Sequence, residues 1–328
     1  MRLRLNRDFF LRWETLLAAI LVVVILFNAT QSPVFLRVEN LVNLFVLHIE
    51  KMIVVLTMTL VIINGEIDLS VASIMGLSAC LIASLYENGA SMEVAALAGL
   101  GAGLVCGIIN GFWVAYVGLP SLAVTLAGLI GYRGVASMLI EDRSVTGFPN
   151  WFNALGQKPL VGAVPLSLIL FFLLLMIFAA LLHFSGFGRY IFVVGNNREA
   201  ARYSGVRVKR VKMILYILSG LAAALAGILY AARLGAVRAS TAEGFELDII
   251  TIVLLGGVSI FGGKGTMLGV ALSILIVLCL RNGMNLLSIT GNTQSTVIGV
   301  LLILSVLIPN AASDFQNLWN RRAFARRE

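Results

Sequence analysis

The chain has 328 residues, a length that in a soluble protein corresponds to about two domains. Its composition excludes a soluble fold, because 59% of the residues are hydrophobic and only 12% are charged, whereas soluble domains carry roughly 25% charged residues. The mean hydropathy of +0.98 supports the same interpretation. We therefore expect an integral membrane protein whose apolar surface faces lipid.

The formal net charge of +8 comes from basic residues that are clustered along the chain. Arg and Lys gather in residues 1–14, 185–212 and 310–328, all outside the apolar stretches. Cytoplasmic segments of membrane proteins carry such an excess of basic residues. We therefore expect both termini and residues 185–210 to be cytoplasmic, and we expect no nucleic-acid partner.

Apolar runs mark ten segments that are long enough, or nearly long enough, to cross a membrane. These runs cover residues 15–31, 45–63, 68–86, 92–117, 119–140, 163–184, 211–233, 247–260, 266–282 and 292–309. Two of them are poor spans, because 45–63 begins with charged residues and 247–260 is short. The sequence thus predicts an all-α bundle of about ten transmembrane helices, within a range of eight to ten. An odd number would place one basic cluster outside the cell.

This pattern also predicts the domain organisation. Residues 1–14 are expected to form a cytoplasmic segment, residues 15–309 a transmembrane domain that includes the cytoplasmic loop 185–210, and residues 310–328 a cytoplasmic basic tail. The first apolar run follows a basic stretch, as in a signal peptide, but no small-x-small cleavage pattern follows it. We expect it to remain as the first membrane helix.

Glycines recur every four residues in one apolar run, at Gly99, Gly103, Gly107 and Gly111. On a helix they form a stripe without side chains, against which a neighbouring backbone can lie closely. A later run repeats the pattern with Gly220, Ala224 and Gly227. These stripes predict helix packing in a polytopic bundle and carry no information on a substrate.

No metal or cofactor site is expected. The three cysteines lie far apart in apolar runs, without a CxxC pattern or a nearby histidine, and are typical of small buried residues. The two histidines, His48 and His183, have too few partners to form a metal site. The sequence also contains no HExxH motif, nucleophile elbow or paired histidines, so that no catalytic residue is predicted.

The short segment from Asn64 to Ser70 contains two carboxylates, Glu66 and Asp68, between two apolar runs. Charged groups at such a position are costly unless they face water or a polar cavity. Asp68 is suited to cap the next helix by accepting a hydrogen bond from the amide of Ser70 or of the residue after it. The other interpretation is a broken helix that lines a translocation path, with Asn64, Glu66, Asp68 and Ser70 as candidate path residues.

Residues 256–266 are rich in glycine and resemble a phosphate-binding loop at first sight. The GxxxxGK[ST] pattern needs glycine at position 258 and Ser or Thr at position 265, where this chain has Val258 and Gly265. We therefore expect that the chain does not hydrolyse ATP itself.

Residues 195–206 form a polar stretch that is unusual among the short loops of a membrane protein. Asn196 or Asn197 can cap a short helix, Glu199 lies in its first turn, and Gly205 can end it. One interpretation is a basic loop that only fixes orientation. The other is a helix that docks on a cytoplasmic partner.

Together these segments are similar to the permease subunits of ribose-type ATP-binding-cassette sugar importers, a family that includes xylose, rhamnose and autoinducer permeases. Residues 58–71 resemble the family pattern MT-x-VI-x-x-GGIDLSVG, residues 195–206 resemble GxNxxAAxxSGI, and residues 255–265 resemble LGGxSxFGGxG. Asn110-Gly111, Pro120 and Thr125-Leu126 also match in order. The resemblance extends from about residue 40 to residue 305. Glu66 and Ala72 depart from it, because ribose permeases more often have glycine there.

The resemblance implies a non-enzymatic permease that is joined to a second permease subunit, identical or different, to two cytoplasmic ATPase subunits and to a periplasmic sugar-binding protein. It implies a location in the bacterial inner membrane and a monosaccharide or related polyol as cargo, such as a rhamnose- or ribose-like sugar or an autoinducer-type ligand. The helix at 195–206 would couple the chain to the ATPase. The implied coupling residues are Asn196, Asn197, Arg198, Glu199, Ala200, Ala201, Arg202, Ser204 and Gly205, of which Arg198, Glu199 and Arg202 are particular to this chain.

Two other classes of function are compatible with a polytopic bundle. An ion-coupled secondary transporter would need inverted repeats and discontinuous helices with coordinating polar groups, and only one broken-helix candidate is visible. A polytopic membrane enzyme would need a cluster of titratable residues at one membrane face, which the sequence does not show.

Overall fold

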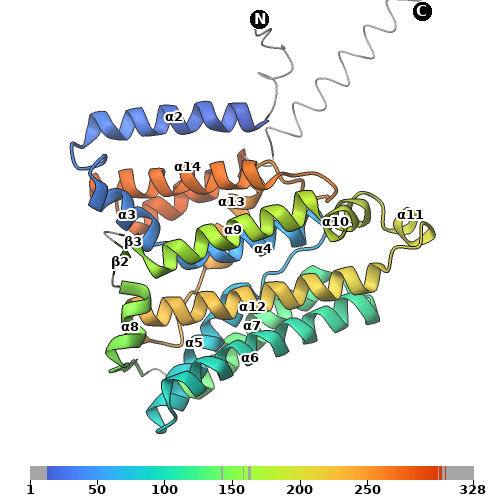
Figure 1. Cartoon of the computed structure of the whole chain (residues 1–328), viewed down its shortest axis with the longest axis horizontal. Helices are drawn as coiled ribbons and strands as arrows, with labels where there is room; N and C mark the ends of the chain where they lie inside the picture. Colours follow the sequence, from blue (N-terminus) through green and yellow to red (C-terminus); the bar gives the residue numbers. More distant parts are fainter. Residues whose placement is uncertain are drawn as a thin grey trace, which may run out of the picture.

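The computed structural model describes residues 13–141, 143–157, 159–161, 164–301, 303–304 and 307. The expected tail at 310–328 and residues 1–12 of the expected N-terminal segment lie outside these ranges. Within them the chain is almost entirely helical, as a lipid-embedded chain requires, because backbone N–H and C=O groups in hydrocarbon must be paired within the segment. The long helices run side by side along one axis (Figure 1).

The described helices follow one another with short connections. They are α2 (Trp13–Gln31), α3 (Val38–Val46), α4 (Ile49–Ile63), α5 (Val71–Glu87), α6 (Met92–Gly111), the π-helix η1 (Phe112–Val117), α7 (Ser121–Ile140), α8 (Asn150–Gln157), α9 (Leu166–Phe184), α10 (Gly186–Asn196), α11 (Arg198–Tyr203), α12 (Val208–Leu234), α13 (Phe245–Leu255) and α14 (Met267–Leu286). Residues 291–301 are also helical.

Within the described ranges, four short strands form two antiparallel pairs. β1 (Val145–Thr146) pairs with β4 (Ala236–Val237), with Val145 opposite Val237 and Thr146 opposite Ala236. β2 (Pro159–Val161) pairs with β3 (Val164–Pro165). The first pair ties the connection after α7 to the connection after α12.

Six helical stretches in the described ranges are long and apolar enough to cross a membrane, namely α2, α6 with η1, α7, α9, α12 and α14. Helices α3 and α4 add a seventh if the pair, bent by 57°, is one span. The expected runs 68–86 and 247–260 correspond to α5, with 17 residues, and α13, with 11 residues. The chain is therefore a multi-pass all-α membrane protein, and the count of about ten spans stays a prediction.

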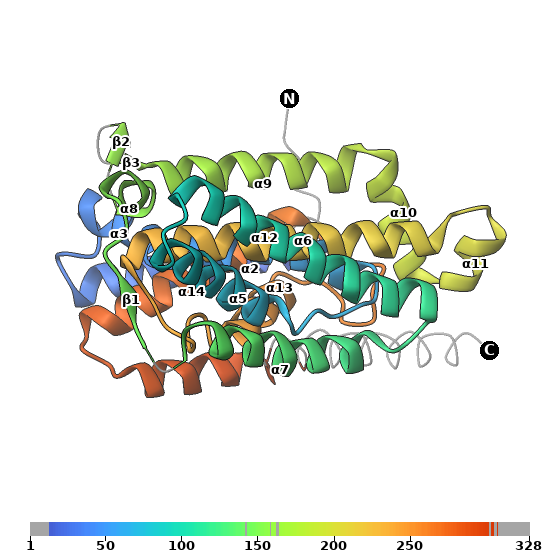
Figure 2. The same cartoon turned by 90° about the horizontal axis from the view of Figure 1, so that it is seen from below.

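The bundle has two distinct ends (Figures 1 and 2). One end, here called the α11 end, holds α10, α11, the start of α2 and the connection between α13 and α14. The opposite end, here called the α8 end, holds α3, α8 and the strand pair β2–β3. The start of α2 is fixed at the α11 end by the indole N–H of Trp13, which donates to the carbonyl oxygen of Leu255 at 3.0 Å.

Helix α12 is the central helix, packed against α4, α5 and α6. Its closest approach is to α6, where a Cβ at Gly103 would collide with the carbonyl oxygen of Gly220 and the methyl group of Ala224. A Cβ at Gly107 would collide in the same way with the carbonyl oxygen of Tyr216. Gly99 instead lies against Ser78 and Ile82 of α5, and Gly111 lies against Met213 of α12.

We expect Gly103→Ala to destabilise the protein, because the added methyl group meets backbone atoms of α12 that cannot rotate away. Overpacking of this kind costs about 1–3 kcal/mol. Gly101→Ala is the matched control on the same helix, since no atom lies within 4 Å of the Cβ it would add. The thermal stability of the two variants is compared by heating each in detergent and measuring the fraction that remains monodisperse. Equal stability of the two variants would contradict the proposed contact.

Candidate functional site

Helices α10 and α11 are separate elements because both starts are capped by side chains. The hydroxyl oxygen of Ser185 accepts a hydrogen bond from the amide of Gly188 at 3.0 Å and begins α10. The side-chain oxygen of Asn197 accepts from the amide of Ala200 at 2.9 Å and begins α11. Gly205 follows α11 with a φ of +82°, a conformation that suits glycine. Of the two expected caps, Asn197 is therefore the cap of α11, while Asn196 is the last residue of α10.

Helix α11 stands on a small hydrophobic base and presents its other faces to solvent. Ala201 is fully buried against Val194 and Val208, whereas Arg198, Glu199, Ala200, Arg202 and Ser204 are exposed. Arg202 and Glu199 form an exposed ion pair at 3.7 Å. Tyr203 is 81% exposed, although sequence reasoning did not select it as a site residue. The two neighbouring alanines of this segment thus have different surroundings.

The three sequence patterns at 58–71, 195–206 and 255–265 meet at the base of α10 and α11. The amide of Gly263 donates to the carbonyl oxygen of Ile63, the last residue of α4, at 2.8 Å. Gly195 packs against that same carbonyl group, and Gly262 packs against Gly195 and Gly65. We call this contact of Gly65, Gly195, Gly262 and Gly263 the glycine junction. A side chain at any of the last three would overlap backbone atoms of another pattern.

Two of the four candidate path residues fasten the α4–α5 connection to its neighbours. Glu66 forms an ion pair with Lys212 of α12, and both side chains are largely buried. The side-chain amide nitrogen of Asn64 donates to the carbonyl oxygen of Ile191 in α10 at 3.3 Å. The short connection is therefore held by α10 and α12, the helices on either side of α11.

The other two candidate path residues form a buried polar cluster. Asp68 is fully buried and accepts hydrogen bonds from the amide of Ser70 at 3.0 Å and the hydroxyl group of Ser70 at 2.6 Å. The hydroxyl group of Ser219 in α12 donates to the second carboxylate oxygen at 2.8 Å. Asp68 thus accepts from the Ser70 amide at the start of α5, as the sequence predicted, and also binds α12.

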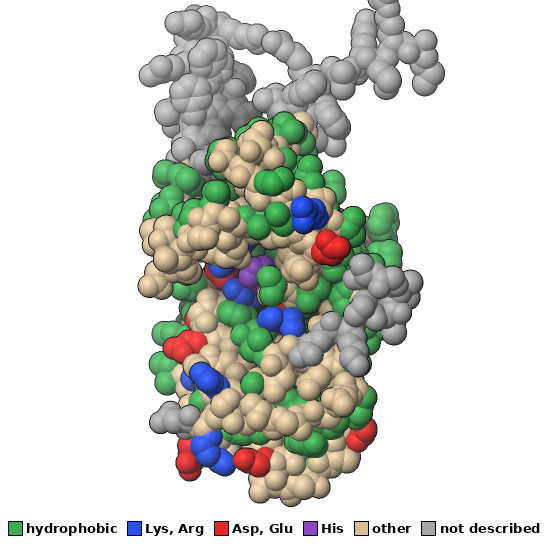
Figure 3. Space-filling view, turned by 90° about the vertical axis from the view of Figure 1, so that its left-hand side faces the viewer, with side chains coloured by type: hydrophobic (Ala, Val, Ile, Leu, Met, Phe, Trp, Pro, Cys, Tyr) green, Lys and Arg blue, Asp and Glu red, His purple; other side chains and the backbone are tan. Residues whose placement is uncertain are grey.

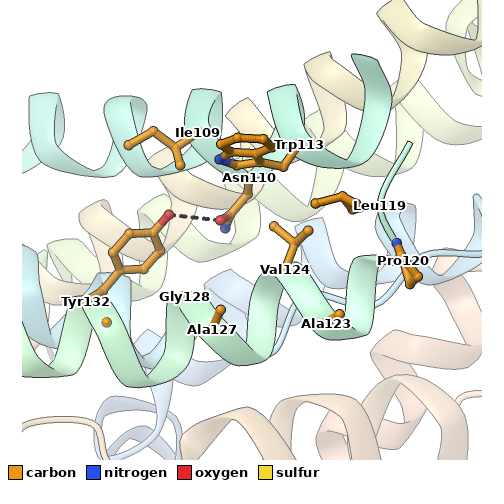
Figure 4. A pocket seen from close by; sticks show the side chains of 11 residues that line it. Ile109, Asn110, Trp113, Leu119, Pro120, Ala123, Val124, Ala127, Gly128 and Tyr132 are labelled. Atoms are coloured by element: carbon orange, nitrogen blue, oxygen red, sulfur yellow. Dashed lines mark hydrogen bonds between the residues drawn. The ribbon is translucent and has the colours of Figure 1, made fainter. Parts of the chain in front are cut away.

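This cluster continues to a cavity between α6, η1 and α7. The side-chain amide nitrogen of Asn110 donates to the hydroxyl oxygen of Ser70 at 2.8 Å. The hydroxyl group of Tyr132 donates to the side-chain oxygen of Asn110, also at 2.8 Å. Figure 4 shows both side chains at the cavity, with the ring of Trp113 above Asn110. The cavity has a volume of about 430 Å³, and its other lining residues are Ile109, Leu119, Pro120, Ala123, Val124, Ala127, Gly128 and Gly131.

None of the four candidate path residues lines this cavity. Ser70 lies behind the cavity wall, hydrogen-bonded to Asn110 and close to Gly128. Sequence reasoning had noted Asn110 as part of the family pattern and had not assigned it to the path. Trp113 and Tyr132 combine flat rings with polar groups, the combination that binding sites for small polar molecules often contain. The cavity is a candidate site for a small molecule that crosses the bundle.

Buried charges at the α8 end join four helices. Asp248 of α13 contacts Lys51 of α4 at 2.5 Å and Arg281 of α14 at 2.8 Å. Glu50 of α4 contacts Arg233 of α12 at 2.6 Å. Figure 3 looks onto this end and shows charged side chains set back in a hollow at its centre. The charges that make 45–63 a poor span in the sequence are therefore paired inside the bundle.

We expect Asp248→Asn to destabilise the protein strongly, because it leaves Lys51 and Arg281 without their shared carboxylate. Removing one partner of a buried ion pair costs about 3–5 kcal/mol. Glu87→Gln is the control, since Glu87 and Arg143 form an exposed pair, a type worth about 0–1 kcal/mol. Thermal unfolding in detergent measures both, and a small effect of Asp248→Asn would show that the buried cluster does not hold the helices together.

The chain is similar to known proteins over most of its length. The family model described as branched-chain amino acid transport system / permease component matches residues 40–306. The autoinducer 2 import system permease protein LsrD of Yersinia pseudotuberculosis serotype O:3 (strain YPIII) is 34% identical over 301 residues, which cover 90% of each chain. The protein of the same name from Yersinia pestis (strain Pestoides F) has the same identity and coverage. No solved structure matches the chain.

Proposed function

We propose that this chain, which belongs to the family of branched-chain amino acid transport system permease components, carries a small molecule across the bacterial inner membrane. The proposed molecule is polyhydroxylated, which the autoinducer 2 import permeases among its relatives support. It is the permease component of an ATP-binding-cassette importer and not itself an enzyme; ATP hydrolysis belongs to a separate subunit. A rhamnose- or ribose-like sugar or an autoinducer-type ligand is the proposed cargo, which the named function of its relatives supports. The family match and the two relatives named above do not support the ion-coupled alternative.

The proposed assembly contains a second permease subunit, two cytoplasmic ATPase subunits and a periplasmic binding protein. In the proposed orientation the α11 end is cytoplasmic, and the ten apolar runs cross the membrane ten times. The basic residues Arg198, Arg202, Arg207, Lys209 and Arg210 support this orientation, since they gather at or next to α11. The expected domain boundaries at residues 15 and 309 stay part of the same proposal.

The observation that carries the proposal is the glycine junction. Force applied to α11 by an ATPase would reach α4 and the connection between α13 and α14 through α10, because Gly195, Gly263 and Ile63 are in backbone contact. It would reach α12 through the ion pair of Lys212 and Glu66. Alternating access needs elements with two packings that a partner can bias, and these contacts connect α11 to the helices that would have to move.

From α12 the proposed movement would continue to the polar cluster beside the cavity. Ser219 of α12 binds Asp68, and Ser70 binds Asn110, so that a shift of α12 against α5 would change the wall of the cavity. We propose that cargo passes along this cavity. The ring of Trp113 would stack on the cargo, and Asn110 and Tyr132 would offer it polar groups.

We expect Ala200→Arg to abolish uptake while the permease remains folded in the membrane. Ala200 is exposed on α11, so that a bulky charge there disturbs a partner and not the protein's own core. We expect a milder effect from Arg202→Ala, because it removes only an exposed ion pair with Glu199, a type worth about 0–1 kcal/mol. Cargo uptake and co-purification of the ATPase are measured in parallel. Normal uptake in Ala200→Arg would leave the segment as an orientation signal only.

The proposed orientation is tested by labelling. We expect Asn197→Cys, at the exposed start of α11, to react with a membrane-impermeant thiol reagent only after the inner membrane is opened. Background labelling is expected to be low, because Cys80, Cys106 and Cys279 are buried. Labelling in intact spheroplasts would reverse the assignment of the two ends.

A further inference from the structure

The connection between α13 and α14 holds an aromatic side chain out into solvent. Phe261 is 79% exposed, and the preceding Ile260 is 37% exposed. Two hydrogen bonds close the backbone beneath them. The amide of Gly262 donates to the carbonyl oxygen of Ser259 at 2.9 Å, and the amide of Ser259 donates to the carbonyl oxygen of Lys264 at 3.0 Å. The amide of Phe261 also donates to the hydroxyl oxygen of Ser259 at 3.3 Å. Phe261 is thus presented on a defined turn.

This turn is fastened beside α11. Gly262 and Gly263 have φ values of +82° and +73°, and a Cβ on either would meet Gly195 or Asn196 at 3.0 Å or less. The turn therefore cannot move independently of the end of α10. Figure 1 shows the connection at the same end of the molecule as α10 and α11.

The surroundings of Phe261 differ from those of other exposed phenylalanines. Phe184, which is 85% exposed, ends the long apolar helix α9, which is a candidate membrane span. Phe261 instead forms an exposed apolar pair with Ile260 in a connection, and this pair is flanked by Ser259 on one side and by Gly262, Gly263 and Lys264 on the other. Tyr203 of α11, at the same end of the bundle, is also strongly exposed. Aromatic residues, phenylalanine among them, are enriched at protein–protein interfaces, and tyrosine and arginine are enriched in binding hot spots.

We propose that residues 259–264 form a second contact with the ATPase subunit, next to α11, and this rests on the proposed function. The ring of Phe261 enters an apolar pocket on the ATPase, and Lys264 lies beside an acidic group at the rim of that pocket. The continuity of the turn with α10 and α11 identifies the ATPase as the occupant, because a partner that covers α11 lies next to the turn. The third sequence pattern, which is not a phosphate-binding loop, thereby acquires a role in recognising the ATPase.

The test uses the full complex of permease, ATPase and binding protein. We expect Phe261→Ala to weaken binding of the ATPase to the permease by about tenfold or more, as loss of an aromatic anchor does. Phe184→Ala is the matched control, equally exposed and of the same type, and we expect it to change binding less than about twofold. Binding is measured by titrating labelled ATPase onto the solubilised permease, together with cargo uptake.

A photoreactive phenylalanine analogue at position 261 provides a second readout that keeps the wild-type shape. We expect adducts with the ATPase, and adducts with lipid alone would overturn the proposal in favour of a membrane anchor. Wild-type affinity in Phe261→Ala would also overturn it. If Ala200→Arg abolishes binding and Phe261→Ala does not, only this second contact fails. If neither variant affects binding, the proposed coupling function fails as well.

Discussion

Contact between bare backbones is the constraint on which the rest of this structure depends. In the interior of the bundle, α6 and α12 approach closely because Gly103, Gly107 and Gly220 have no side chains. At the α11 end, the connections after α4 and after α13 meet the end of α10 at the glycine junction. The hydrogen bond from the Gly263 amide to the carbonyl oxygen of Ile63 joins the second connection to the end of α4.

Charge is handled differently at the two ends of the bundle. At the α8 end, Asp248 gathers Lys51 and Arg281, and Glu50 pairs with Arg233. These buried pairs link α4, α12, α13 and α14. At the α11 end most basic residues are exposed, and the exception is Lys212, which pairs with Glu66. One end is therefore tied together by ion pairs, while the other offers its charge to a partner or to the membrane surface.

The two ends are connected through α12. Its first turns carry Lys212, its middle carries Ser219 beside Asp68, and its last turn carries Arg233 beside Glu50. These three contacts bind one helix to the connection after α4, to the start of α5 and to the start of α4. A helix with polar contacts at three levels cannot shift at one level without straining the others. This arrangement links the two ends of the bundle through one helix.

Local and compositional features were readable from the sequence by itself, because they depend on neighbouring residues. Hydropathy established a polytopic helical membrane protein, the hydrogen bond from the Ser70 amide to Asp68 followed from a separation of two residues, and the three patterns established the family. Only the tertiary structure decided which distant residues meet. Lys51 and Asp248 are separated by 197 positions and Lys212 and Glu66 by 146, so that nothing in the local sequence pairs them. The meeting of the three patterns at the glycine junction, and the cavity lined by Asn110 and Tyr132, likewise follow from how the helices cross, since helix packing and not sequence order sets which faces come together.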